Sequence, residues 1–230
     1  MAKQNVKNEG DERLESIETT LGNAELFIVN NQKTIIIALA ILIVAVLAFF
    51  GVKKYYLEPR EADAQAAIYH AEQYFENDNF ATALNGDGNY LGFLDVIDEF
   101  GSTKTANLAK YYAGICYLNT GDYNKAVEYL KSFKGKDVLV SSLALGALAD
   151  AYMELDNMAE AVKYYEQAAN KNSNTFTSPM YLLRAGMASE MMGNYQQAIE
   201  FYNKIKAEYP SSNEGFYIEK YIARAQAAKN

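Results

Sequence analysis

An uncharged apolar run is the feature that most constrains this chain. Between Lys33 and Lys53 lie 19 residues, from Thr34 to Val52, which read TIIIALAILIVAVLAFFGV. As an α-helix, with a rise of about 1.5 Å per residue, the run would be roughly 28 Å long, close to the roughly 30 Å of a bilayer's hydrocarbon core. No second run of this kind occurs in the 230 residues. We therefore expect a single transmembrane helix over residues 34–52, and neither a purely soluble protein nor a multi-span transporter.

The residues around this run favour a retained anchor over a cleaved signal. The run begins at residue 34, after an acidic segment, whereas a signal peptide has a short apolar region after a basic start. It ends at Phe49 and Phe50 and is followed by Lys53 and Lys54, which are the residue types found at a membrane interface. A buried core helix is the alternative, but a core helix of this length would normally show a polar face.

The flanking charges leave the orientation open. Lys33 precedes the run, whereas Lys53, Lys54 and Arg60 follow it. An excess of Lys and Arg weakly favours a cytoplasmic location for the C-terminal side, but long domains are translocated largely regardless of charge.

The charge of the other two segments limits their partners. Residues 1–33 carry a net charge of −2 and residues 53–230 a net charge of −6. Neither has the basic excess that binding to nucleic acid requires, and net attraction of the larger segment to anionic lipid is not expected. The N-terminal segment also has an apolar stripe at helical spacing, which predicts a short amphipathic helix. This helix would either rest on the membrane surface or contact a partner's helices. The stripe consists of Leu14, Ile17, Leu21, Ala24 and Ile28.

Internal repeats dominate the C-terminal segment. Similar stretches start at Asn107, Ser142 and Pro179, which are 35 and 37 residues apart, the period of a helix–turn–helix array. Each has a predicted turn, at Gly121, Asp156 or Gly193. Small residues in the helices would allow close approach, and tyrosines would fill the wedges between helices. The small residues are Ala113, Gly114, Ala149, Ala185 and Gly186, and the tyrosines are Tyr117, Tyr129, Tyr152, Tyr165 and Tyr202.

This pattern resembles the tetratricopeptide repeat. The prediction is an all-α solenoid of helical hairpins, about nine helices in all, with repeats near 64–100, 107–140, 142–175 and 179–212 and a capping helix over 213–228. The first repeat is degenerate. Its first helix would begin near Pro59, and an insertion at 85–89 would displace its second helix to 90–100.

Candidate catalytic and metal-binding patterns are weak in this sequence. His70 is the only histidine, and no glycine-rich phosphate motif occurs. The stretch around Asp87 is similar to the start of a calcium loop, but Tyr90 and Val96 stand where that loop needs glycine and glutamate. Cys116, the only cysteine, lies in an apolar run and is expected to be a buried structural thiol. We predict no catalytic, cofactor or metal site and no small-molecule substrate, so the chain is not expected to be an enzyme.

A protein-binding groove is the remaining candidate site. In such arrays the inner face of each first helix lines a concave groove, and methionine side chains suit varied apolar partners. The same faces also place Asn119, Gly146, Asp150, Glu154 and Glu190 on the expected lining. Alternatively, the C-terminal helix covers the groove, and the apolar side chains that line it are part of the core. The predicted binding residues are Leu108, Tyr111, Ile115, Leu118, Leu143, Met153, Met180, Leu183, Met187 and Met191.

The whole arrangement resembles the YfgM-like family, an ancillary subunit of the bacterial SecYEG translocon. The likeness rests on the acidic N-terminal segment, the one span and the short array after it. It implies an inner-membrane protein with a cytoplasmic N-terminus and periplasmic repeats. Its partners would be translocon subunits, exported polypeptides or periplasmic chaperones. The alternative function is a structural scaffold of an envelope complex, with the groove filled by the chain itself.

Overall fold

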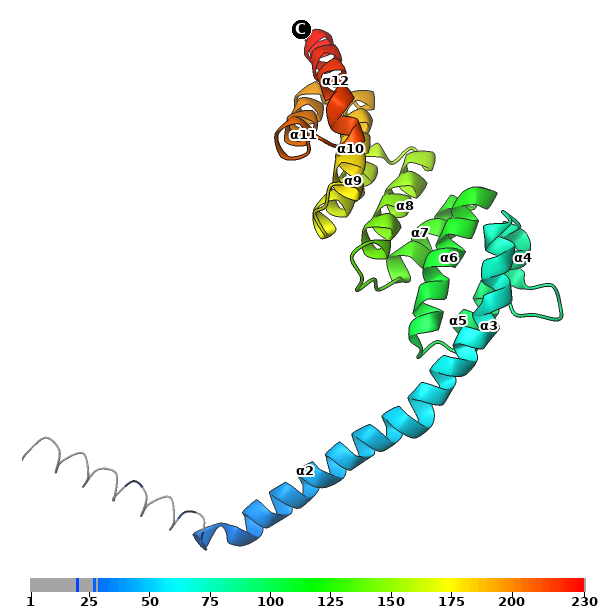
Figure 1. Ribbon diagram of the computed structural model, residues 1–230, viewed down its shortest axis with the longest axis vertical. Coiled ribbons are helices and arrows are strands. Elements are labelled where there is room, and N and C mark those ends of the chain that lie inside the picture. The colour runs from blue at the N-terminus through cyan, green and yellow to red at the C-terminus, as the bar shows by residue number, and fades with distance from the viewer. Residues whose placement is uncertain (1–19, 21–26, 28, 230) are drawn as a thin grey trace, which may run out of the picture. The chain divides into compact units, whose positions relative to one another are not determined.

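The computed structural model describes Thr20, Phe27 and residues 29–229, and these residues form helices and turns without any strand among them. The all-α prediction is therefore confirmed. The chain divides into two compact units, Met1–Tyr56 and Leu57–Asn230, whose helices are labelled in Figure 1. The five stripe residues expected between positions 14 and 28 lie outside the described residues.

The first unit contains the apolar helix α2 (Gln32–Val52), whose 21 residues include no buried side chain. At about 1.5 Å per residue its length is roughly 31 Å. Within the described residues, the helical stretch that contains α2 is the one that is long and apolar enough to cross a membrane. Large apolar side chains of α2 are exposed, among them Ile36, Leu42 and Phe49.

The helix α3 (Glu58–Glu76) begins the second unit, after a π-helical turn, η1 (Lys53–Leu57). Glu61, in the first turn of α3, accepts hydrogen bonds from the backbone N–H groups of Lys104 (2.7 Å) and Thr105 (3.2 Å) and from the Thr105 hydroxyl (2.8 Å). Burial acts to raise the pKa of Glu61, but these hydrogen bonds outweigh it and the pKa is lowered. Glu61 thus caps the N-terminus of the next hairpin, where free N–H groups favour an anion.

Three helical hairpins and a final helix follow. Each helix packs against the next one along the chain, and the last, α12 (Asn213–Lys229), packs on α11 and also contacts α10. Consecutive first helices contact each other as well. The hairpins are α6 (Lys104–Thr120) with α7 (Tyr123–Ser132), α8 (Val140–Glu154) with α9 (Met158–Lys171), and α10 (Thr177–Met191) with α11 (Tyr195–Glu208).

The turns inside the three hairpins lie where the sequence predicts them. Gly121, Asp156 and Gly193 have φ angles of +85°, +55° and +75°, in the left-handed region. In each turn the next residue's N–H bonds to the carbonyl five residues earlier, which is the bond that closes a Schellman motif. These bonds are Asp122 to Tyr117 (3.0 Å), Asn157 to Tyr152 (2.9 Å) and Asn194 to Ser189 (2.9 Å).

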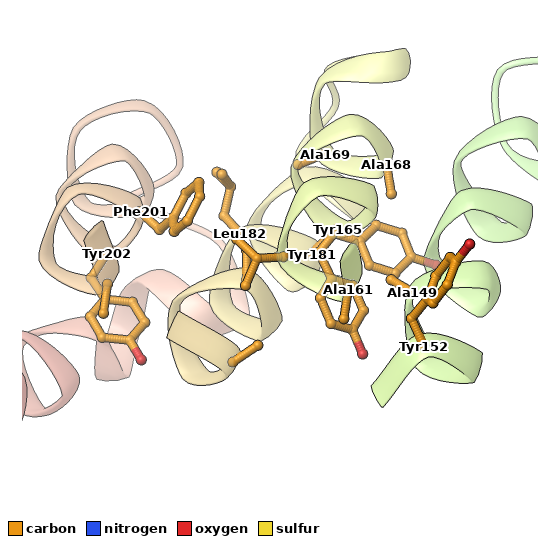
Figure 2. Packing of buried hydrophobic residues seen from close by; sticks show 14 of the residues in the cluster. Ala149, Tyr152, Ala161, Tyr165, Ala168, Ala169, Tyr181, Leu182, Phe201 and Tyr202 are labelled. Carbon is orange, nitrogen blue, oxygen red and sulfur yellow. The ribbon is translucent and has the colours of Figure 1, made fainter. Parts of the chain in front are cut away.

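Small residues and tyrosines pack the hairpins together, as predicted. Ala113, Ala149 and Ala185 are fully buried. A Cβ atom at Gly114 would overlap Leu130 of α7, so the two helices of this hairpin approach closely because no side chain separates them. Figure 2 shows buried tyrosines at successive levels of the array, beside small side chains. The predicted wedge tyrosines Tyr152, Tyr165 and Tyr202 are buried, and the rings of Tyr117 and Tyr129 stack with centroids 5.3 Å apart.

The degenerate first repeat differs from its prediction. A helix does lie within the predicted 90–100, namely α5 (Phe93–Glu99), but a separate short helix, α4 (Phe80–Asn85), precedes it, so the second helix is split in two. The split follows from Gly86 and Gly88, whose φ angles of +74° and +88° end the helix. Asp87 then holds the loop, because its carboxylate accepts hydrogen bonds from the N–H groups of Asn89 (2.9 Å) and Tyr90 (2.8 Å). As a result, the described part of the second unit has ten helices rather than about nine.

Candidate protein-binding surface

The ten predicted binding residues all lie on first helices of the hairpins, α6, α8 and α10. We call them together the first-helix surface. Eight are half-buried, and two, Met187 and Met191, are exposed. Seven of the half-buried residues pack against the same core cluster, so their inner sides help to hold the array together while their outer sides face solvent. These seven are Tyr111, Ile115, Leu118, Leu143, Met153, Met180 and Leu183.

The C-terminal helix does not cover the methionine end of this surface. The helix α12 packs mainly on α11 through Ile218, Ile222 and Ala225, which are buried. Met187 and Met191 remain 41% and 63% exposed. Two large, flexible, apolar side chains thus meet solvent one helical turn apart.

Two ion pairs link α10 to the helices on either side of it, α8 and α12. Arg184 of α10 donates to Asp150 of α8, with Nη1–Oδ1 and Nη1–Oδ2 distances of 2.7 and 2.8 Å. Arg224 of α12 lies 2.7 Å from Glu190 of α10. Tyr165 of α9 also donates its hydroxyl hydrogen bond to Asp150. Two of the three carboxylates on the predicted lining, Asp150 and Glu190, are therefore already paired with arginines.

Buried tyrosines lie directly beneath these pairs. Burial raises the pKa of Tyr165, and the charge of Asp150 raises it further. Burial likewise raises the pKa of Tyr202, and Glu190 adds to the effect. Both hydroxyl groups therefore stay neutral at physiological pH.

Gly146 does not belong to the exposed lining. It is buried, and a Cβ atom there would overlap the ring of Tyr181, which comes from α10 of the next hairpin. This glycine makes room for a neighbouring aromatic ring, which explains why its place on the inner face of α8 does not make it accessible.

Sequence reasoning missed Arg184 and Arg224. Each stands 34 residues after its carboxylate partner, Asp150 or Glu190, which is close to the repeat period. A search for opposite charges one repeat apart would have identified both pairs.

Cys116 and His70 are both packed against other side chains of the second unit. Cys116 is fully buried, and burial raises the pKa of its thiol to about 12, as expected for a structural cysteine. The ring of His70 stacks on Tyr90, with centroids 3.5 Å apart. Among the residues that the structure describes, no three His, Cys, Asp or Glu side chains gather as a metal site would require.

Comparison with known families identifies the repeats. One tetratricopeptide repeat model matches residues 146–213, and a second matches residues 108–137. Comparison with curated proteins gave no match. The matched stretches cover most of the three hairpins built from α6 to α11, and repeats of this kind mediate protein–protein interactions. The chain therefore contains tetratricopeptide repeats, in residues 108–137 and 146–213.

Proposed function

We propose that this chain is a membrane-anchored protein that binds other polypeptides through the first-helix surface. The observation that carries this proposal is the exposure of Met187 and Met191 on an otherwise half-buried apolar stripe. Methionine side chains are unbranched and polarisable, so such a surface adapts to apolar segments of varied sequence.

The anchor in this proposal is α2. Its 21 residues exceed the 7 to 15 apolar residues of a signal peptide's central region. Lys53 and Lys54 follow it directly, and Tyr55 and Tyr56 come next, as at a membrane interface.

The proposed partners are extended or partly folded apolar segments of exported proteins, translocon subunits or periplasmic chaperones. The resemblance to the YfgM-like family supports this choice, together with the pairing of Arg184 and Arg224 to carboxylates. Paired arginines do not offer the free basic groups that would grip a peptide's terminal carboxylate.

Photo-crosslinking in cells tests the binding surface. A crosslinking amino acid at Met187 of the full-length chain is expected to capture translocon subunits or exported chains. The same amino acid at Glu166, an exposed position of α9, serves as the control. The replacements Met187→Glu and Met191→Glu should leave the helical circular dichroism unchanged and reduce capture from a crosslinker at Met180 by at least about fivefold, because each loses apolar contact. Equal capture from Glu166 and Met187 would contradict the proposal.

The scaffold function has one observation in its favour, namely that seven of the ten surface residues already pack on the core. The replacement Met187→Glu separates the two functions, because a folded Met187→Glu protein with unchanged partners would favour the scaffold. Unfolding by Leu183→Glu would be compatible with either function, since Leu183 packs on the core.

The proposed location is the bacterial inner membrane, with the N-terminus in the cytoplasm and the repeats in the periplasm. A reporter that is active only in the periplasm, fused after Asn230, is expected to be active. The same fusion to a reporter active only in the cytoplasm should be inactive. The opposite result would remove exported proteins from the set of partners.

A further inference from the structure

The linkers between successive hairpins lie along one edge of the second unit. They are residues 100–103, 133–139, 172–176 and 209–212; Leu57 and the first turn of α3 begin the same edge, and the start of α12, residues 213–217, ends it. We call this the tether edge, because α3 is the first helix that follows α2 and η1 along the chain. The turns inside the hairpins lie at the other ends of the helices, and we call that side the far edge.

Contacts between neighbouring linkers make the tether edge continuous. Glu61 of α3 bonds to the N–H of Lys104, as described above. Asn107 exchanges two hydrogen bonds with the backbone of Lys134, at 3.0 and 3.2 Å. The Asn172 amide donates to the carbonyl of Val138 at 3.0 Å. Thr175 and residues 208–213 line one shared hollow at the last linker. The edge therefore runs unbroken from α3 to α12.

Exposed apolar side chains concentrate on this edge. Among the described residues from Leu57 onward, ten large apolar side chains are exposed, and six of them lie on the tether edge. The exposed fractions include 62% for Val138, 70% for Phe176, 72% for Phe216 and 69% for Tyr217. The six are Leu57, Val138, Leu139, Phe176, Phe216 and Tyr217.

The two edges also differ in charge. When each linker is taken with one flanking residue on either side, together with the first turn of α3 and the start of α12, the tether edge is close to neutral: it has Arg60, Lys104, Lys134, Lys136 and Lys171 against Glu58, Glu61, Glu99, Asp137, Glu208 and Glu214. The far edge, counted in the same way, has no Lys or Arg and has Glu76, Asp78, Asp122, Glu154 and Asp156. The net charge of −6 over residues 53–230 thus conceals a separation of charge between the edges.

We propose that the tether edge docks on the surface of the bilayer that α2 crosses. This inference rests on the anchoring role of α2 proposed above. Phenylalanine and tyrosine side chains enter the headgroup region favourably, and a nearly neutral edge with four lysines is repelled less by anionic lipid than the acidic far edge is. The exposed apolar side chains occur singly or as adjacent pairs along the edge rather than as one patch, which suits a fluid lipid surface better than a shaped protein partner.

The short connection makes weak docking sufficient. Only the residues of η1 separate α2 from α3 along the chain, so a short connection tethers the edge that begins at α3 to the anchor. Tethering of this kind gives an effective concentration of about millimolar or more, so the edge needs little affinity of its own.

Fluorescence quenching in vesicles tests the proposal on the full chain. A fluorophore is attached to Ser173→Cys on the tether edge or to Asn124→Cys near the far edge, both at exposed positions. Cys116 is buried and should not react in the folded protein. The vesicles contain phosphatidylcholine, phosphatidylglycerol and a lipid with a nitroxide headgroup. We expect strong quenching at Ser173→Cys and none at Asn124→Cys. Equal quenching at both positions, or none at either in protein that floats with the vesicles, would overturn the proposal.

A flotation assay distinguishes failure of the docking proposal from failure of the proposed anchoring function. If the protein does not float with the vesicles, α2 is not an anchor and both proposals fail. If it floats and the Ser173→Cys probe is not quenched, only the docking proposal fails.

Matched variants test whether the exposed apolar side chains of the tether edge cause the quenching. The combined replacements Phe176→Ser, Phe216→Ser and Tyr217→Ser should reduce quenching at Ser173→Cys to the level seen at Asn124→Cys, with unchanged circular dichroism. The control combines Tyr69→Ser and Met191→Ser, which remove exposed apolar side chains away from the tether edge and should leave quenching unchanged. Persistent quenching in the triple variant would overturn the role of these side chains.

Discussion

Raising the pH from about 8 to about 11 is expected to lower the free energy of unfolding by several kcal/mol. Tyr165, Tyr181, Tyr202 and Cys116 are buried, and burial raises the pKa of each. Their stabilising effect is complete below the unfolded pKa values, about 10 for tyrosine and about 8.5 for cysteine. Above those values the unfolded chain releases protons that the folded chain keeps, so stability falls by up to about 1.4 kcal/mol per pH unit for each group. Urea denaturation followed by circular dichroism measures the change.

Two tyrosine variants check this assignment. The replacement Tyr181→Phe removes one buried ionisable group, so the loss of stability at high pH should shrink by about 1 kcal/mol. Tyr217 is 69% exposed, and Tyr217→Phe should leave the pH dependence as it is. A free energy of unfolding that does not change between these pH values would show that the rings ionise without unfolding.

The replacement Gly146→Ala is expected to destabilise the array by about 1–3 kcal/mol, as overpacking of a core does. In a helix, this change normally stabilises by roughly 0.5–1 kcal/mol, because alanine is the better helix former. Here the added Cβ would overlap the ring of Tyr181, which is itself only 3% exposed and has little room to move. A lower free energy of unfolding in Gly146→Ala would therefore support the close approach of the two hairpins, and a higher one would contradict it.

A double-mutant cycle tests the contact itself. Tyr181→Leu shortens the side chain that the new methyl group would meet, so Gly146→Ala should cost much less in that background. The coupling between the two changes, measured by urea denaturation, should be about 1 kcal/mol or more. Additive effects would mean that the cost arises elsewhere.

The sequence predicts best those features that depend on local geometry. A left-handed turn residue favours glycine or aspartate, so Gly121, Asp156 and Gly193 mark the turns in the sequence itself. Close helix approach needs small side chains, so the buried Ala113 and Ala149 are also predictable. Helical periodicity likewise places the first-helix surface on one side of each first helix.

Features that depend on contacts between separate elements could not be predicted from the sequence. The pairs Asp150–Arg184 and Glu190–Arg224 join different hairpins, so they depend on how neighbouring helices are aligned. The exposure of Met187 depends on the course of α12, which periodicity does not give. The split between α4 and α5 depends on how the Asp87 side chain closes its loop.

The cap that Glu61 provides has a mechanical consequence. In a linear array each helix contacts mainly its neighbours, so a force applied at one end is transmitted through successive joints. The first joint after the anchor combines the three hydrogen bonds between the Glu61 carboxylate and the start of α6 with the buried cluster that holds Ile68 and Ala71 of α3. A drag on the anchored chain, such as a bound polypeptide moving away from the membrane, would load this joint before the tyrosine-packed hairpins beyond it.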